Sequence, residues 1–184
     1  MRGRALVASA ALLAAYETTL AVARFRRRER VFAEARARAV QLGRPLVVVG
    51  DPDGGAHTRL SRAYGCGDVC VDLHGCPLCP VSIEADVTQA LEHFADDSAV
   101  VYVSCVLEYV SDAAAAEAEL LRIAGERDRL FVVYVDPWSL TSVMYPGARW
   151  RGGASGRWRA VTPTQKGLLV GGLLAGAGLV ALRA

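Results

Sequence analysis

Four cysteines in the first half of the chain have the residue type and spacing of a metal site. Cys66, Cys70, Cys76 and Cys79 follow one another as C-x3-C-x5-C-x2-C, with His74 between the second and third. Zinc prefers thiolate ligands, and the final C-P-L-C segment has the spacing of half a structural zinc site. We therefore expect these four cysteines to bind zinc. Disulfides are a weaker interpretation, because an odd total of five clustered cysteines fits a reducing compartment better.

The elements that must position chemistry alternate along the middle of the chain. Apolar segments at 45–50, 68–73, 81–85, 99–105 and 129–136 predict strands, and 56–64, 87–94 and 112–124 predict helices. Continuous apolar strands separated by helices favour an α/β fold, with a mostly parallel Rossmann-like sheet and helices on both faces. Such sheets bind ligands beyond the carboxyl ends of their strands.

Over roughly residues 46–145, this pattern resembles class I S-adenosylmethionine-dependent methyltransferases. Gly50 and Gly54 match glycines of the family's cofactor loop, although Val48 stands where the family has an acid and Pro52 where it has a further glycine. Asp72 ends the second strand, where the family's acid holds the ribose hydroxyls. The segment L-E-Y-V at 107–110 resembles the family's Leu-Glu-His-Val.

The resemblance implies an S-adenosylmethionine site formed by residues after several strands: Gly50, Asp51, Gly54, Asp72, Asp86 and Leu107. Glycines let the backbone approach a ligand, and a carboxylate can accept hydrogen bonds from two neighbouring hydroxyls. The loop D-P-D-G is also ordinary turn chemistry. A fold does not imply its usual activity, so a methyltransferase and a degenerate, non-catalytic relative both remain open.

Residues 1–23 predict a membrane helix. Ala5 to Ala23 reads ALVASAALLAAYETTLAVA, with Glu17 as its only charge, and a spanning helix needs ~20 such residues. A signal peptide and an amphipathic surface helix are the alternatives. The arginine-rich run that opens the predicted linker helix at 24–44 favours a retained anchor, and it predicts that the α/β domain at 45–146 lies on the cytoplasmic side.

Residues 162–184 predict a second membrane helix. No charge interrupts Gly167 to Leu182, and the spacing of Gly167, Gly171, Gly172 and Gly176 predicts close approach of other membrane helices. The preceding segment, 147–161, is rich in Gly, Arg and Trp, as expected next to lipid headgroups.

Composition is consistent with a membrane protein. The chain is 53% hydrophobic and carries a net charge of only +2, which gives no global field for a specific nucleic-acid partner. The sequence thus predicts a membrane-anchored, methyltransferase-like protein with lipids and membrane helices as partners. Two alternatives remain: a non-catalytic structural membrane protein of an assembly such as a virion, then in the virion membrane, and a zinc-stapled membrane adaptor.

Overall fold

The computed structural model describes residues 2–51, 65–135, 139, 149–152, 157–160 and 171–172. The chain divides into two compact units. One unit is Phe25–Tyr134, and the other joins Met1–Arg24 to Val135–Ala184. Gly54, the helix expected at 56–64 and nearly all of the apolar segment at 162–184 lie outside the described residues.

The unit Phe25–Tyr134 contains a five-stranded sheet in the order β3-β2-β1-β4-β5. Its strands are β1 (Leu46–Val49), β2 (Val69–Asp72), β3 (Ser82–Glu84), β4 (Val100–Ser104) and β5 (Leu130–Val133). All four pairings are parallel. The predicted parallel α/β architecture is therefore confirmed.

The two central strands show why runs of apolar residues in the sequence predict strands of this sheet. β1 and β4 are buried along their whole length, and Val48 is in register with Cys70 on one side and Tyr102 on the other. A strand covered on both faces needs continuous apolar residues instead of alternation. Because the chain order reverses direction at β1, the sheet has its switch point between β1 and β4.

Helix α1 runs from Arg2 to Leu42 without a break, so the predicted anchor and linker helices form one element. Its end is set by Gly43, which adopts φ +61, and by the bond from the Arg44 N–H to the Ala39 carbonyl. Within Phe25–Tyr134, Ala35 and Ala39 of α1 pack on one face of the sheet. No helix in the described part of the chain meets the length and hydropathy of a membrane span.

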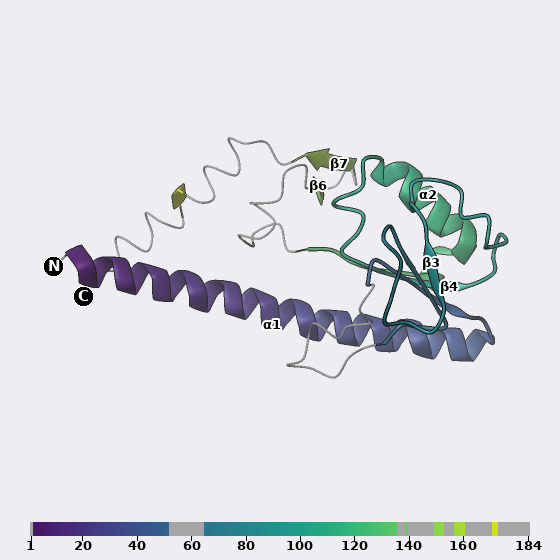
Figure 1. Ribbon diagram of the computed structural model, residues 1–184, viewed down its shortest axis with the longest axis horizontal. Coiled ribbons are helices and arrows are strands. Elements are labelled where there is room, and N and C mark those ends of the chain that lie inside the picture. The colour runs from purple at the N-terminus through teal and green to yellow at the C-terminus, as the bar shows by residue number, and fades with distance from the viewer. Residues whose placement is uncertain are drawn as a thin grey trace. The chain divides into compact units, whose positions relative to one another are not determined.

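Helix α2 (Ala113–Ala124) covers the other face, as Figure 1 shows. Asp112 caps its first turn by accepting hydrogen bonds from the N–H groups of Ala114 and Ala115. A short 3-10 turn, η1 (Arg127–Arg129), leads into β5.

The helix expected at 87–94 is wrong, because this stretch forms successive turns. The Asp86 carboxylate accepts from the backbone N–H of Thr88, and the Glu119 carboxylate accepts from the N–H of Leu91. The Asp86 bond is one that a helix N-cap could also make, but the Glu119 side chain takes the Leu91 N–H, a backbone donor that a helix would have satisfied internally.

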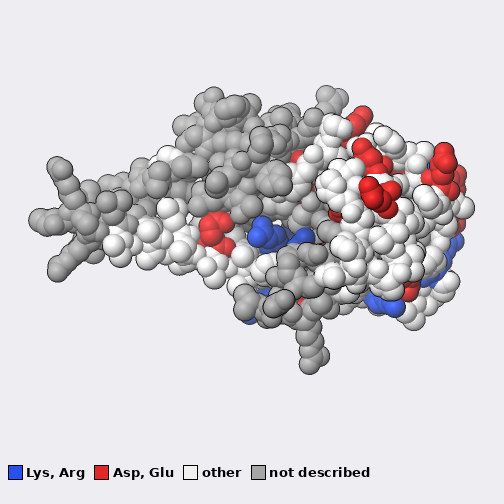
Figure 2. Space-filling model, viewed as in Figure 1, with Lys and Arg blue, Asp and Glu red and all other residues white. Residues whose placement is uncertain are grey.

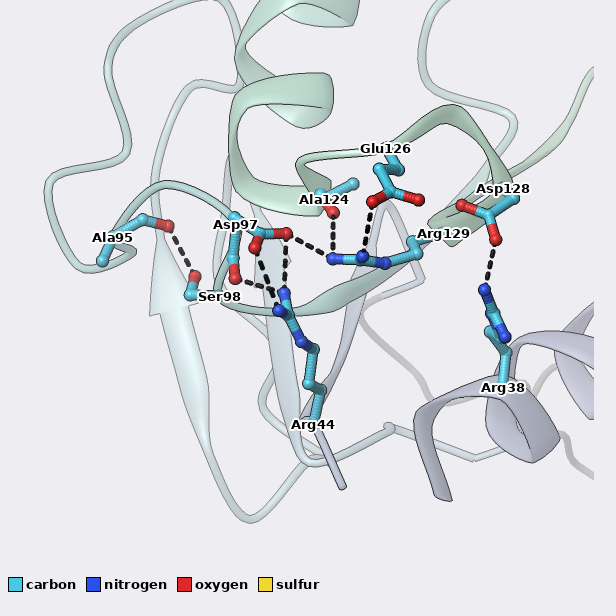
Figure 3. A network of polar contacts seen from close by, with 9 residues as sticks. All are labelled: Arg38, Arg44, Ala95, Asp97, Ser98, Ala124, Glu126, Asp128 and Arg129. Atoms are coloured by element: carbon cyan, nitrogen blue, oxygen red, sulfur yellow. Dashed lines mark hydrogen bonds and ion pairs between the residues drawn. The ribbon is translucent and has the colours of Figure 1, made fainter. Parts of the chain in front are cut away.

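An ion-pair network ties the amino edge of the sheet together (Figure 3). The Asp97 carboxylate accepts from Arg44 at 2.8 and 3.0 Å and also pairs with Arg129. Arg38 of α1 pairs with Asp128 in η1. The hydrogen bonds from Arg44 are the main cause that lowers the pKa of Asp97. These ion pairs hold together the amino ends of β1, β4 and β5, at the edge of the sheet opposite the carboxyl ends of the strands.

The second unit contributes a hairpin that the sequence did not predict. Strands β6 (Arg149–Gly152) and β7 (Arg157–Ala160) pair antiparallel, with Trp150 opposite Arg159 and Arg151 opposite Trp158. On the face in Figure 2, acidic and basic side chains both occur over the described surface.

Candidate ligand site at the carboxyl edge of the sheet

Gly50 lies where β1 and β4 separate. Its φ is +79, and its N–H donates to the Val71 carbonyl at 3.0 Å. A Cβ at this position would lie 1.8 Å from Cγ2 of Val106 and 3.1 Å from the Ser104 carbonyl oxygen. Only glycine fits this backbone and this space. The open side of Gly50 is therefore filled by the chain's own Val106.

Asp72 and Asp86 follow β2 and β3 at the same edge. Both are half-buried. One carboxylate oxygen of Asp72 accepts from the N–H of His74 at 3.0 Å, and one of Asp86 accepts from the N–H and hydroxyl of Thr88 at 2.8 and 2.7 Å. Since an ionised carboxylate offers about four acceptor positions, these turn bonds leave capacity for the hydroxyls of a ligand.

Asp51 and Leu107 reach the same edge but are buried. Asp51 is 1% exposed and Leu107 is fully buried. The Asp51 carbonyl oxygen lies 3.5 Å from the Cys70 sulfur. The structure thus brings together five of the six predicted cofactor residues at one edge, with Asp72 and Asp86 the partly accessible acids among them.

Buried charged side chains act on Tyr102 of β4, and the sequence reasoning missed this. Arg28 of α1 is 8% exposed, and its backbone carbonyl accepts from the Tyr102 hydroxyl at 3.4 Å. Burial is the largest cause of the raised pKa of Tyr102. The positive charge of Arg28 lowers this pKa, and the negative charge of Asp51 raises it further. Glu108 is also buried, at 4% exposed.

A signal for Arg28 was present in the sequence. Arg28, Phe32, Ala35 and Ala39 are spaced 4, 3 and 4 residues apart, which is the repeat of one helix face. Phe32 packs edge-on against Tyr102 with ring centroids 5.4 Å apart. The apolar residues that share this helix face are what indicate that Arg28 points inward. Without them, Arg28 looks like one more member of a solvent-exposed run of arginines.

The four clustered cysteines are paired as two disulfides, Cys66–Cys79 and Cys70–Cys76. Their Cα atoms are 5.4 and 6.1 Å apart, within the range that such bonds need. This arrangement differs from the expected four-thiolate zinc site, because each sulfur is bonded to another. No group of three or more His, Cys, Asp or Glu within the described ranges is arranged to hold a metal ion. Zinc binding concerns the reduced chain and stays a prediction.

Cys105, the residue after β4, is the cysteine that forms no disulfide. It adopts φ +56, a left-handed conformation that is uncommon for a residue other than glycine. Its N–H donates to the Val133 carbonyl at 2.8 Å, which fixes the turn that carries Val106 over Gly50.

Comparison with known proteins adds no relative. No family model, curated protein or solved structure matches this chain significantly. The function must therefore be argued from the site.

Proposed function

We propose that this protein is a membrane-anchored protein whose α/β domain binds S-adenosylmethionine at the carboxyl edge of its sheet. The observation that carries the proposal is the sheet order β3-β2-β1-β4-β5 with Asp72 at the end of β2, next to Gly50 at the end of β1. In open parallel sheets, ligands bind at this switch point, and an acid after the second strand suits ribose hydroxyls. The proposal covers binding alone.

The residues fit the two parts of this ligand unequally. Asp72 is half-buried, and its one turn bond leaves acceptor capacity for the ribose hydroxyls. The methionine part would approach Gly50, whose open side Val106 fills. Binding there requires the Val106 side chain to move, which is a local change because Val106 belongs to a turn after β4.

Calorimetric titration of the full chain in detergent with S-adenosylmethionine tests the proposal. We expect Asp72→Asn to keep the turn bond to His74 and to weaken binding at least tenfold, since losing a charged acceptor costs about 1.5–3 kcal/mol. The matched control is Glu92→Gln, an exposed acid on the β3–β4 connection, which should bind as the unaltered chain does. No heat from the unaltered chain, or equal binding by Asp72→Asn, would refute the proposal.

A second candidate is a non-catalytic structural membrane protein of an assembly such as a virion. It is favoured by Val106 against Gly50 and by the two disulfides, since disulfides persist at virion and cell surfaces and are rare in the cytosol. It predicts stoichiometric abundance in the purified assembly and no heat with the cofactor. Trace abundance together with bound ligand would contradict it.

A further inference from the structure

The last quarter of the chain has a one-sided charge. Residues 137–184 contain no Asp or Glu, although the whole chain is nearly balanced at net +2. The basic residues in this stretch are Arg149, Arg151, Arg157, Arg159, Lys166 and Arg183. Four of these six fall in β6 and β7, so the hairpin holds most of the basic residues of this stretch.

The hairpin repeats one tripeptide on both of its strands. β6 reads R-W-R-G and β7 reads R-W-R-A, and their register sets Trp150 opposite Arg159 and Arg151 opposite Trp158. Residues directly opposite each other share one side of a ribbon, and successive residues alternate between sides. The register thus joins one arginine position to one tryptophan position in each of the two central pairs of the hairpin.

Tryptophan and arginine together suit a headgroup layer. Tryptophan is enriched at membrane–water interfaces, and the arginine guanidinium can bind phosphate or carboxylate oxygens through two hydrogen bonds. The uncharged apolar stretch from Gly167 to Leu182 begins seven positions after β7 ends at Ala160. That continuity favours a bilayer over a nucleic acid, because a nucleic-acid arm needs no adjoining apolar segment.

We propose that the β6–β7 hairpin binds the anionic headgroups of a bilayer, and this rests on the proposed membrane anchoring. Each arginine near an anionic surface contributes about 1 kcal/mol, which corresponds to roughly a fivefold change in lipid preference. The hairpin thus selects anionic over zwitterionic lipid for the chain. The apolar segments alone would insert into either.

Tryptophan quenching by brominated lipid reports this preference directly. The chain has three tryptophans, so Trp138→Phe leaves Trp150 and Trp158, both in the hairpin. The full chain is reconstituted in mixed phosphatidylcholine–phosphatidylserine vesicles in which one or the other lipid is brominated at equal mole fraction. We expect stronger quenching by brominated phosphatidylserine. Equal quenching by the two lipids would overturn the proposal.

Paired substitutions separate the hairpin from charge elsewhere. Arg151→Gln with Arg159→Gln should remove most of the preference, while the corresponding Lys variants should keep most of it. The matched control, Arg36→Gln with Arg127→Gln, removes two exposed charges from the α/β unit, away from both predicted membrane segments, and should leave the preference unchanged. A control that loses the preference equally would refute a role for the hairpin.

Two further measurements distinguish failure of the hairpin from failure of the anchor. Flotation with neutral vesicles tests the anchoring alone, so a chain that floats without phosphatidylserine preference refutes only the hairpin proposal. A chain that floats only with anionic vesicles, and loses this in Arg151→Gln with Arg159→Gln, refutes the anchor and retains the hairpin. Single-stranded RNA is then added at the same total negative charge as the anionic lipid. If it releases the hairpin from the vesicles, this favours a nucleic acid as the ligand and overturns the lipid proposal.

Discussion

Replacing Gly50 by alanine tests the geometry on which the candidate site depends. The substitution places a methyl group 1.8 Å from Cγ2 of Val106 at a backbone φ of +79. The left-handed backbone costs about 1–2 kcal/mol, and overpacking adds about 1–3 kcal/mol. We therefore expect Gly50→Ala to lower the free energy of unfolding by about 2–5 kcal/mol.

Truncating the neighbour should recover the packing part of that loss but not the backbone part. Val106→Ala alone removes methyl groups from a half-buried side chain, at a cost of about 1 kcal/mol. In Gly50→Ala/Val106→Ala the 1.8 Å conflict with Cγ2 is gone, while the tight contacts to the Ser104 carbonyl oxygen at 3.1 Å and to Cβ of residue 106 at 3.3 Å remain, so the two losses should not fully add. We expect a coupling free energy of about 1–3 kcal/mol, as contacting residues show.

Urea unfolding of the full chain in detergent, followed by far-ultraviolet circular dichroism, measures the four free energies of this cycle. Gly67→Ala is the matched control, because Gly67 has φ +68 and its Cβ would lie 2.6 Å from the Leu46 carbonyl oxygen. Truncating Val106 cannot relieve that backbone conflict. Losses that add within about 0.5 kcal/mol for Gly50 would refute the packing of Val106 on Gly50.

Two further predictions concern the disulfides and acid stability. Alkylation of the unreduced, unfolded chain should modify Cys105 alone of the five cysteines. The double variant Cys66→Ser/Cys79→Ser should lose about 2–4 kcal/mol of unfolding free energy. Five reactive thiols and one bound zinc per chain would instead support the metal site. The hydrogen bond from the Leu46 N–H, and after it the one from Arg36, lowers the pKa of Asp68 in the folded chain. The ionised Asp68 therefore contributes its full stabilisation of the fold above the unfolded pKa of ~4, and this contribution is lost as the pH falls through the lower folded pKa. Asp68→Asn should flatten the acid limb of stability between about pH 5 and 2, and an unchanged limb would contradict this.

The sheet was predictable because its signal is local. A strand buried on both faces must be apolar throughout, and Leu46–Val49 and Val100–Ser104 meet that requirement almost without exception. The positions of Asp72 and Asp86 then follow, since acids that end neighbouring parallel strands reach the same edge.

What the sequence could not supply depends on contacts between distant residues. Leu91 does not enter a helix because Glu119, on α2, takes its backbone N–H. The cysteine pairing depends on which Cα atoms approach within bonding range, and the spacing C-x3-C-x5-C-x2-C is compatible with metal or disulfides. Strand β6 has no apolar run, and the alternation of polar and apolar residues in R-W-R-G covers only three positions, which is too short for a strand signal.

Helix α1 connects the two main expectations, membrane anchoring and a ligand site. Its residues from Phe25 onward belong to the α/β unit, where Phe32 packs on Tyr102 and Arg36 binds Asp68 at 2.9 Å. Arg28 of the same helix is buried, and its charge and that of Asp51 both act on the pKa of Tyr102. The part of this helix from Phe25 onward is thus a core element of the domain, and removing its packing would expose Tyr102.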